Sequence, residues 1–570
     1  MRYSTWDITG FDRDKAVEFY DHGVNPLVSV FLASRNVSDI SAVHAVTGEN
    51  PAAFNDPFLM ADMDKAVRRI KKAVDNGERI AIYGDYDVDG MTASAVFALW
   101  LNSKAVEYEI YIPGRIDEGY GLNTNALDTL KANGVGLVVT VDCGITAIEE
   151  TRYAKAIGLD LIITDHHECR DVLPEAYAVV DPKRPDCGYP CKSLAGVGVA
   201  FKLVCALEND YLSSDIFRKY SEFVAVGTVA DVMPVDDENR ELIRQGLNIL
   251  NTFPSPGLSC LINEINAEPG KITASTIGYM LAPRLNAAGR MGQSDLSVKL
   301  LLTESFEESK QLAAELCHLN TERRKLEQDI FNEAVSMLPE TVPDKPIILA
   351  SRNWHQGVAG IVASRMAERY QLPTVIISID GDGSGHGSCR SYGSFGIYSA
   401  LCACEDILID YGGHDKAAGI TVMEENLDLL RQRIIDYYHD FYSARADSVP
   451  GNTLELDFEV EKPELLSIEN IQELERLEPF GHNFPSPRLC IYDAEVLSIL
   501  SIGAGKHSKI KVKKSGKPLE CIFFSVAAGD LGICEGMTAD IAFEPQINEF
   551  RGRSSVQLQL FDIRASGNVI

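Results

Sequence analysis

The sequence is poor in cations. It carries 53 Lys and Arg residues against 83 Asp and Glu residues, which gives a formal charge of −30. Contacts to nucleic-acid phosphates need cations, so this balance argues against a nucleic-acid partner unless the basic groups are gathered in one groove. Divalent cations held by some of the acidic groups would offset part of the excess.

Long apolar runs and a leader-like start are also missing. The first residues, MRYSTWDITGFDRDKA, lack the basic start and apolar stretch of a signal peptide. No apolar run reaches the roughly 20 residues that cross a bilayer. The 13 cysteines are scattered, and Cys187 and Cys191 have no second Cys or His pair at zinc-finger spacing. We therefore expect reduced thiols, a cytoplasmic location and no membrane partner.

The chain is long enough for several domains, since 570 residues exceed what one hydrophobic core holds together. Between residues 79 and 180, apolar runs rich in β-branched residues alternate with helical stretches. This alternation predicts an α/β domain with a parallel sheet that is buried on both faces. The predicted strands are Arg79–Tyr83, Ala105–Ile112, Leu137–Val141, Leu161–Thr164 and Ala178–Val180, and the first predicted helix starts at Thr92.

The second half of the chain changes pattern twice. Residues 306–338 are charged, with leucines at helical spacing, and predict one long helix or a helical hairpin that connects two domains. A second α/β region begins near Pro346. After Pro450, short alternating segments predict an antiparallel β-barrel, for which an OB-fold is the natural choice. The expected division is an N-terminal segment (1–60), a first α/β domain (61–300), a connector helix (301–340), a second α/β domain (341–450) and the barrel (451–570).

Acidic and imidazole side chains follow three of the predicted strands. The residues concerned are Asp85, Asp87 and Asp89 after the first strand, Asp142 after the third, and Asp165, His166 and His167 after the fourth. In an open parallel sheet, ligands bind beyond the carboxyl ends of the strands, so these side chains are predicted to meet at one edge. Carboxylates packed so densely repel one another unless cations lie among them.

Carboxylates combined with imidazole suit Mn²⁺ or Mg²⁺. Two such ions can clamp the attacking and leaving oxygens of a phosphoryl displacement and lower the pKa of a bound water. Each acidic motif alone could equally be a solvated turn, and the histidine pair alone could be an ordinary surface or core pair. Their convergence on one edge favours a metal site.

These motifs resemble those of the DHH phosphoesterases, which also have a counterpart of Gly227-Thr228-Val229-Ala230-Asp231. The resemblance implies that two divalent metal ions are held by Asp87, Asp89, Asp142, His166 and Asp231. It further implies that Asp165 accepts a hydrogen bond from the His166 ring and that His167 faces the substrate, as a phosphate contact or a proton donor.

One position departs from the family pattern. Many relatives have a histidine four residues before the first aspartate of the pair, where this chain has Tyr83. A phenol is a poor ligand at neutral pH, because its reference pKa is about 10. Asp85 lies close in sequence and could help to hold that metal, so the identity of this ligand stays open.

Further segments resemble the RecJ exonucleases, a branch of this family. They are Pro113-Gly114-Arg115 with Glu118-Gly119-Tyr120-Gly121, Pro283–Met291, Trp354–Arg365 and Tyr411–His414. Guanidinium forks, hydroxyls and backbone N–H groups bind phosphodiesters, although each arginine alone could equally form a surface salt bridge. The expected nucleic-acid contacts are Arg115, Arg284, Asn286, Arg290, His355, Arg390, Ser391, Gly412 and Gly413, and His414 is expected to position the scissile phosphodiester together with His167.

The RecJ resemblance implies a metal-dependent exonuclease that degrades single-stranded DNA from the 5′ end and releases 5′-mononucleotides, in DNA recombination and repair. Two alternatives stay open: a phosphodiesterase acting on short oligonucleotides or cyclic dinucleotides, and a non-catalytic DNA-binding scaffold. The long helix and barrel favour a polymeric substrate, and the intact aspartates favour catalysis. We expect a monomer with single-stranded DNA as partner, while a single-stranded-DNA-binding protein or a helicase stays open as a protein partner.

Overall fold

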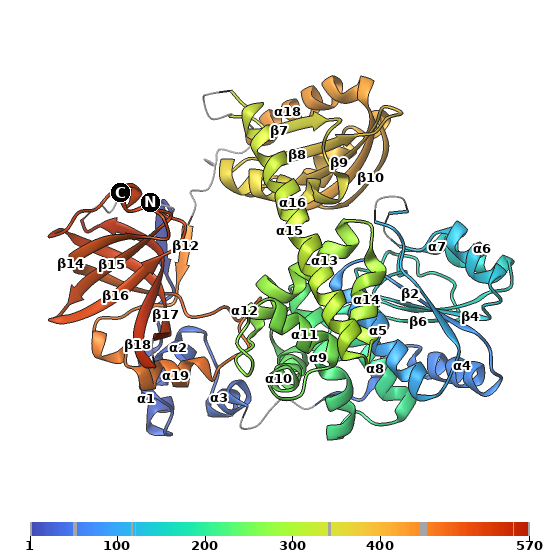
Figure 1. Ribbon diagram of the computed structural model, residues 1–570, viewed down its shortest axis with the longest axis horizontal. Helices are drawn as coiled ribbons and strands as arrows, with labels where there is room; N and C mark the ends of the chain where they lie inside the picture. The colour runs from blue at the N-terminus through green and yellow to red at the C-terminus, as the bar shows by residue number, and fades with distance from the viewer. Residues whose placement is uncertain are drawn as a thin grey trace. The chain divides into compact units, whose positions relative to one another are not determined.

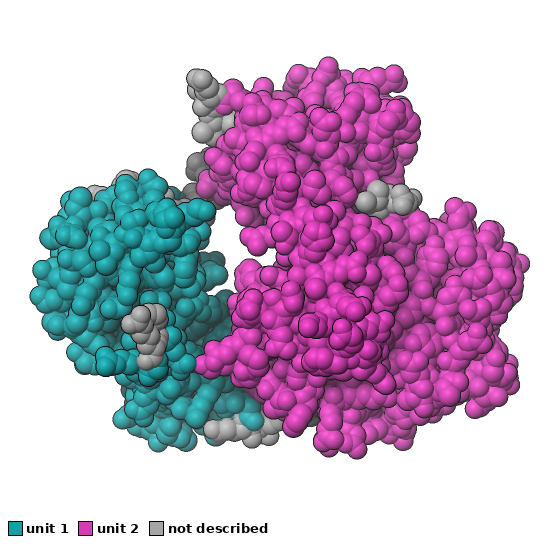
Figure 2. Space-filling model, in the orientation of Figure 1, with its two compact units in different colours: residues 1–53, 450–570 teal, residues 54–449 magenta. Residues whose placement is uncertain are grey.

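The computed structural model describes residues 3–48, 54–115, 118–119, 121–339, 344–443, 453–550 and 552–567 (Figure 1). Tyr120, in one of the segments that resemble the RecJ exonucleases, lies outside the described residues. The chain forms two compact units, residues 54–449 and residues 1–53 with 450–570 (Figure 2). No helix in the described ranges is long and apolar enough to cross a membrane. All 13 cysteines carry free thiols, as expected.

The first sheet of the larger unit has five parallel strands in the order β3-β2-β4-β5-β6. The strands are β2 (Ile80–Gly84), β3 (Tyr108–Tyr111), β4 (Leu137–Val141), β5 (Asp160–Thr164) and β6 (Ala178–Val180). Every residue of β2, β4 and β6 is buried, as continuous apolar runs require. The predicted parallel α/β sheet is confirmed, with β4 at its centre.

Helices cover both faces of this sheet. On one face, α6 (Thr124–Ala132) and α7 (Ile148–Ala156) share a core with alternate strand residues such as Val138 and Ile163. The helices α4 (Met63–Asp75), α5 (Val88–Ser103) and α8 (Gly196–Glu208) also contact the strands. The short η1 (Pro57–Leu59) precedes α4.

Two boundaries differ from the prediction. The edge strand β3 is shorter than Ala105–Ile112, because Ala105 has a φ of 53° and its N–H donates to Asn102 O at 3.0 Å, which closes the end of α5. Helix α5 starts at Val88 rather than Thr92, because the Asp87 side chain accepts a hydrogen bond from Gly90 N and caps the helix.

A layer of helices follows the sheet. It consists of α9 (Ser214–Ala230), α10 (Asp237–Thr252), α11 (Pro256–Glu264), α12 (Ala274–Thr276), the π-helical turn η2 (Ile277–Leu281), α13 (Ala282–Arg290) and α14 (Ser294–Leu302). The next helix, α15 (Phe306–Ser336), is a single helix of 31 residues rather than a hairpin. It packs against α11, α13 and α14, and its later residues Ile330 and Phe331 join the core of the second α/β region.

The second α/β region is built on a mixed sheet in the order β10-β11-β9-β8-β7, in which only the pair of β7 and β8 is parallel. Its strands are β7 (Ile347–Ser351), β8 (Thr374–Ile379), β9 (Ser384–Arg390), β10 (Leu408–His414) and β11 (Ala417–Met423). Its helices are α16 (Gln356–Tyr370), α17 (Ile397–Cys402), η3 (Glu405–Ile407), η4 (Glu424–Asn426) and α18 (Leu427–Ser443).

The smaller unit contains the predicted barrel. Its strands β14 (Leu489–Ile502), β15 (His507–Lys514), β16 (Lys517–Phe523), β18 (Arg553–Ala565) and β17 (Thr538–Phe550) follow one another around the barrel, and pairing of β14 with β17 closes it. One of these pairings, β16 with β18, is parallel, and the others are antiparallel. The remaining elements are β13 (Phe458–Glu459), η5 (Pro463–Leu465), α19 (Ile468–Glu475) and η6 (Ala528–Asp530).

The N-terminal segment belongs to the same compact unit as the barrel. Strand β1 (Thr5–Ile8) pairs in parallel with β12 (Thr453–Leu456), and α1 (Arg13–Asp21), α2 (Pro26–Ser34) and α3 (Ile40–Thr47) follow. Phe19 and Phe31 share one buried core with barrel residues such as Phe543. Trp6 donates from Nε1 to Asp562 Oδ2 at 3.0 Å, and the Arg564 guanidinium lies 4.1 Å from the centre of its ring. Residues from the two ends of the sequence therefore stabilise each other.

This packing predicts that Trp6→Ala destabilises the smaller unit. The substitution removes a hydrogen bond, a cation–π contact and ring packing, for a loss of about 2 kcal/mol in the free energy of unfolding. Urea unfolding of the full chain measures the loss. Tyr20→Ala, which removes a ring that is 56% exposed in the same unit, serves as the control and should change stability by less than about 0.5 kcal/mol. Equal midpoints for the two variants would contradict the contribution assigned to Trp6.

Candidate metal centre

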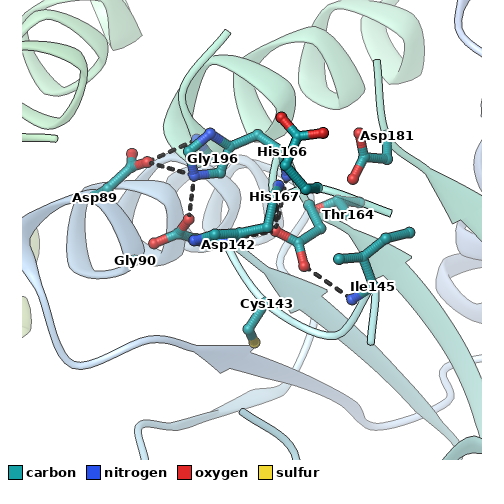
Figure 3. Close-up of polar contacts among 12 residues, drawn as sticks. Asp89, Gly90, Asp142, Cys143, Ile145, Thr164, His166, His167, Asp181 and Gly196 are labelled. Atoms are coloured by element: carbon teal, nitrogen blue, oxygen red, sulfur yellow. Dashed lines mark hydrogen bonds and ion pairs between the residues drawn. The ribbon is translucent and has the colours of Figure 1, made fainter. Parts of the chain in front are cut away.

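The carboxyl edge of the first sheet gathers acidic and imidazole side chains. Asp85 comes directly after β2, Asp142 after β4 and Asp165 after β5, while Asp231 caps the end of α9. Figure 3 shows Asp89, Asp142 and His166 pointing toward one another. The side chains predicted to meet at this edge do so: Asp85, Asp87, Asp89, Asp142, Asp165, His166, His167 and Asp231.

The potential ligands form adjacent groups. One group consists of Asp85, Asp87 and Asp142, and a second consists of Asp89, His166 and Asp231; within each group the ligand atoms lie within 4.8 Å of one another. His166 Nε2 lies 3.1 Å from Asp142 Oδ1 and 3.6 Å from Asp231 Oδ2, so the two groups touch. Asp142 and His166 also form a group with Asp165 and His167. Two adjacent ligand groups of this kind could hold two neighbouring divalent ions.

Asp89 is held by the start of a helix. Its carboxylate accepts hydrogen bonds from Gly196 N at 2.7 Å and Val197 N at 2.8 Å, the first residues of α8. A helix N-terminus stabilises negative charge, which explains how a carboxylate that is only 1% exposed can be tolerated here. Burial, followed by repulsion from Asp231, still raises the pKa of Asp89 well above its ordinary value.

Asp142 is aimed at the cluster by an unusual backbone conformation. Its φ is 64°, in the left-handed region, and its N–H donates to Thr164 O at 3.0 Å. A Cβ at Gly196 would lie 2.5 Å from Asp142 Oδ1, so only glycine lets α8 approach this closely. Burial, followed by repulsion from Asp89, raises the pKa of Asp142 well above its ordinary value.

Several buried ligand atoms in the cluster make no hydrogen bond of good geometry within the described residues: Asp85 Oδ1, Asp142 Oδ1 and His166 Nε2, although the last two lie 3.1 Å apart. A buried polar atom left unpaired costs about 1–3 kcal/mol, so such a concentration calls for a ligand. Burial, followed by the charge of His167, lowers the pKa of His166 to about 3, which leaves the ring neutral and able to donate a lone pair. These residues fit Mn²⁺ or Mg²⁺.

Asp165 has a different partner from the one expected. Its Oδ1 accepts from His167 Nδ1 at 2.7 Å and from the backbone N–H of His166 at 2.7 Å, so the prediction that it holds the His166 ring is wrong. Although burial favours the neutral carboxyl, hydrogen bonding and attraction from His167 hold the pKa of Asp165 below its ordinary value. Burial disfavours the His167 cation, but the bond to Asp165 wins and raises the pKa of His167 to about 9.

Tyr83 takes no part in the acidic groups. Its hydroxyl donates to Gly121 O at 2.9 Å and accepts from Asn123 Nδ2 at 3.3 Å, and its ring belongs to the core on the side of α6 and α7. Burial raises its pKa further above the ordinary value of a phenol. Asp85, by contrast, lies with Asp87 and Asp142, so the structure favours Asp85 for the ligand left open at this position.

Asp181 was not singled out from the sequence. It follows β6 at the same edge and is fully buried, with Oδ1 accepting from Lys183 N at 2.7 Å (Figure 3). Its Oδ2 has no partner among the described residues, and burial, followed by the charge of Asp165, raises its pKa to about 7. The rule that found the other acids, a carboxylate directly after a buried strand, applies to it equally.

Three of the predicted phosphate contacts lie close together beside the acidic groups. The Arg115 guanidinium lies 4.8 Å from the ring centre of Tyr86, which stands between Asp85 and Asp87 in the sequence. Arg290, the last residue of α13, donates to Gly357 O at 3.3 Å. Burial, followed by repulsion from Arg115, lowers the pKa of Arg290 to about 9, and Arg390 adds to this repulsion. Cations that repel one another at this site favour a bound anion.

The glycine-rich residues lie at one end of the second sheet. His414 ends β10 and pairs with Ala417 of β11, which also pairs with Arg390 of β9. Gly413 has a φ of 137°, and a Cβ there would lie 2.4 Å from Ala417 O, so this turn requires glycine. Gly412 and His414 are exposed, and the N–H of Ser391 donates to Lys416 O at 3.0 Å.

The other predicted contacts have structural partners. Asn286 Oδ1 accepts from Val88 N at 3.2 Å, which ties α13 to the start of α5. Arg284 donates to Met280 O at 2.7 Å, and His355 Nδ1 accepts from Gly357 N at 3.2 Å as the cap of α16. Within the described ranges, no hydrogen bond or ion pair links Arg284, His355 or His414 to the acidic groups.

The chain matches known protein families in three places. Residues 79–228 match the DHH family, N-terminal domain, residues 344–440 the DHHA1 domain and residues 456–562 the RecJ OB domain. The chain is 38% identical to the single-stranded-DNA-specific exonuclease RecJ of Bacillus subtilis (strain 168) over 565 residues, which cover 98% of this chain and 71% of the relative. The chain belongs to the RecJ family. The predicted DHH and RecJ resemblance is therefore confirmed.

Two further RecJ proteins are similar to this chain, one in sequence and one in fold. RecJ of Escherichia coli (strain K12) is 34% identical over 94% of this chain and 96% of its own. The crystal structure of RecJ in complex with Mn²⁺ from Thermus thermophilus has a TM-score of 0.83 and 27% identity, over 98% of this chain and 79% of that chain. The predicted fold class, two α/β regions and an OB barrel as in RecJ, is confirmed.

The repulsion within the acidic groups predicts opposite effects of Asp142→Asn with and without metal. In chelator, the variant should be more stable than the unsubstituted protein by about 1–2 kcal/mol, because one of the mutually repelling buried carboxylates is gone. With Mn²⁺ at about 100 times its dissociation constant, the unsubstituted protein should gain about 2.7 kcal/mol and the variant clearly less. Thermal unfolding at neutral pH measures both effects.

A matched control is Asp215→Asn, which removes a carboxylate whose side chain is 87% exposed. This control should follow the unsubstituted protein in both conditions. If Mn²⁺ stabilised Asp142→Asn as much as Asp215→Asn, Asp142 would not be a ligand.

Proposed function

We propose that this protein is a metal-dependent exonuclease that hydrolyses single-stranded DNA from the 5′ end, releases 5′-mononucleotides and acts in DNA recombination and repair. The proposal is carried by one observation: two adjacent groups of potential metal ligands lie beside the guanidinium groups of Arg115, Arg290 and Arg390. The substrate is supported by relatives named single-stranded-DNA-specific exonuclease at 34% and 38% identity over nearly all of this chain. Solved RecJ complexes with Mn²⁺ and Mg²⁺ support these ions.

In this proposal, the residues of the two ligand groups hold two divalent ions: Asp85, Asp87 and Asp142 in one group, and Asp89, His166 and Asp231 in the other. Ions bound there would lower the pKa of water and stabilise charge on the attacking and leaving oxygens. Asp142 belongs to one group and His166 to the other, and their side chains meet, so they fix the distance between the two ligand groups.

His167 is the proposed general acid. Asp165 accepts the Nδ1 proton of His167, which fixes the orientation of the ring and directs Nε2 away from Asp165. The His167 side chain is 43% exposed and can therefore meet a substrate. With a pKa raised to about 9, the ring carries a proton at neutral pH that it can give to the leaving 3′-oxygen. His414 is proposed to position the scissile phosphodiester together with His167.

The DNA end is proposed to lie on the arginine side of the centre. Arg115, Arg290 and Arg390 would bind the backbone and, with Ser391, the terminal 5′ phosphate. Gly412 and Gly413 would offer backbone N–H groups in a turn without side chains. Arg284, Asn286 and His355 are proposed as further contacts along the strand. A net charge of −30 disfavours binding of nucleic acid overall. These arginines provide the local positive charge that a phosphate needs.

We propose a monomeric, cytoplasmic enzyme that meets a single-stranded-DNA-binding protein or a helicase at its substrate. The proposed division of the chain is an N-terminal segment (1–60), a DHH catalytic domain (61–300), a connector helix (301–340), a DHH-associated domain (341–450) and an OB-fold (451–570).

The function is tested by digesting a long 5′-labelled single strand, a matching duplex and a dinucleotide with Mn²⁺, Mg²⁺ or EDTA. We expect metal-dependent release of labelled mononucleotide from the long single strand and none from the duplex. Asp142→Ala should abolish hydrolysis, a loss of at least about 1000-fold, and leave DNA binding in place. Faster cleavage of the dinucleotide would favour a short-substrate phosphodiesterase, and binding without cleavage by the unsubstituted protein would favour a scaffold.

If Asp85 is the metal ligand where many relatives use a histidine at the position of Tyr83, substitutions of Asp85 and Tyr83 should have very different effects. Asp85→Ala should lower kcat by about 100-fold or more and raise the Mn²⁺ concentration needed for activity, because one ligand group loses a carboxylate. Tyr83→Phe should leave kcat within about twofold, because the hydroxyl bonds to Gly121 and Asn123 instead of the acidic groups. Activity titrations with Mn²⁺ compare the two. A larger loss in Tyr83→Phe than in Asp85→Ala would reverse this assignment.

A further inference from the structure

Tyr279 is the most exposed of the large apolar side chains in the described ranges, at 82%. It lies in η2, a π-helical turn that interrupts the helical path between α12 and α13. Turns of this kind are rare and occur frequently at functional sites. No part of the proposed chemistry uses Tyr279, so its exposure calls for a separate explanation.

The turn that carries Tyr279 is anchored beside the metal centre. A Cβ built on Gly278 would lie 3.7 Å from Val229 Cγ1, so η2 packs on the last turn of α9, the helix that Asp231 caps. On its other side η2 continues directly into α13, which carries Asn286 and Arg290. Tyr279 therefore lies between an element that supplies a proposed metal ligand and the helix that supplies a proposed phosphate contact.

A second exposed apolar residue also lies next to Val229, at the end of α9. Val232 follows Asp231, is 65% exposed and has a φ of 57°. A β-branched residue in the left-handed region is a genuine outlier. The conformation is held by hydrogen bonds from Val232 N to Val229 O and from Met233 N to Thr228 O, each 3.2 Å, which close the end of α9. Strain retained at such a position points to a function.

We propose that Tyr279 and Val232 form a platform on which a base of the single strand stacks while its backbone passes the metal centre. The inference rests on the proposed function and adds the contact that holds the bases. Every base has a π-face, so an exposed tyrosine ring binds a strand of any sequence. A chain with a net charge of −30 gains little from general attraction to DNA, which increases its dependence on stacking.

The test compares three variants on a long 5′-phosphorylated single strand with Mn²⁺. Tyr279→Ala should lower kcat/KM by roughly 10-fold, mainly through KM, because stacking on one base is lost. Tyr279→Phe keeps the π-face and should stay within about twofold. Tyr177→Ala is the matched control: this tyrosine is 49% exposed and precedes β6, an edge strand of the parallel sheet, so no change is expected. Because Tyr279 is so exposed, its truncation leaves the core intact.

Substrates that carry one abasic nucleotide at successive positions separate stacking from a structural effect. The unsubstituted enzyme should slow when the missing base reaches the platform, at one fixed distance from the cleaved bond, and Tyr279→Ala should show no such pause. Equal kinetics of Tyr279→Ala and Tyr177→Ala, or an unchanged pause in Tyr279→Ala, would overturn the platform alone. Failure of the unsubstituted protein to digest any single strand would overturn the proposed exonuclease together with it.

Discussion

The mutual repulsion of buried carboxylates at the edge of the first sheet is the constraint on which the rest of the larger unit depends. Asp85, Asp89 and Asp142 are at most 4% exposed, and burial together with like charges raises the pKa of each. A protein gains nothing in stability from such a cluster, since unpaired buried charges are destabilising. The fold holds these side chains close together in three ways. The strand order brings them to one edge, the left-handed conformation of Asp142 directs its side chain to the cluster, and N–H groups of α8 bind Asp89. Bound cations then convert this repulsion into affinity.

Close packing of the backbone allows the acidic side chains to be held this near to one another. A Cβ at Gly196 would lie 2.5 Å from the Asp142 carboxylate, and one at Gly227 would lie 2.3 Å from Thr92 Oγ1 and 3.0 Å from Asp89 Oδ1. Gly90 is equally confined, with Asp85 N at 2.5 Å from the position of its Cβ. Helices α5, α8 and α9 therefore converge on the acids at separations that only glycine allows. The glycines set the spacing of the ligand groups as much as the aspartates supply the charge.

The sequence was sufficient to predict the sheet and the meeting of the acids, because runs such as Leu137–Val141 identify buried strands and parallel strands present their carboxyl ends at one edge. It was not sufficient for features set by distant contacts. Which ring Asp165 binds depends on side-chain directions after β5, and the pairing of β1 with β12 joins positions 448 residues apart, as Thr5 and Thr453 show. Tyr279 and Val232 follow no local pattern, since their exposure is a property of the packed helices.

Two clusters of like charge lie side by side in this unit, and each lacks a ligand of the opposite charge. The acids repel one another and gain from divalent cations; Arg115, Arg290 and Arg390 repel one another, which lowers the pKa of Arg290, and they gain from an anion. A phosphodiester that bridges metal ions and guanidinium groups satisfies both clusters at once, whereas a neutral ligand leaves the charge of both uncompensated. The selectivity for a phosphate-bearing substrate therefore follows from the juxtaposition of the two clusters, with Tyr86 between them in contact with Arg115.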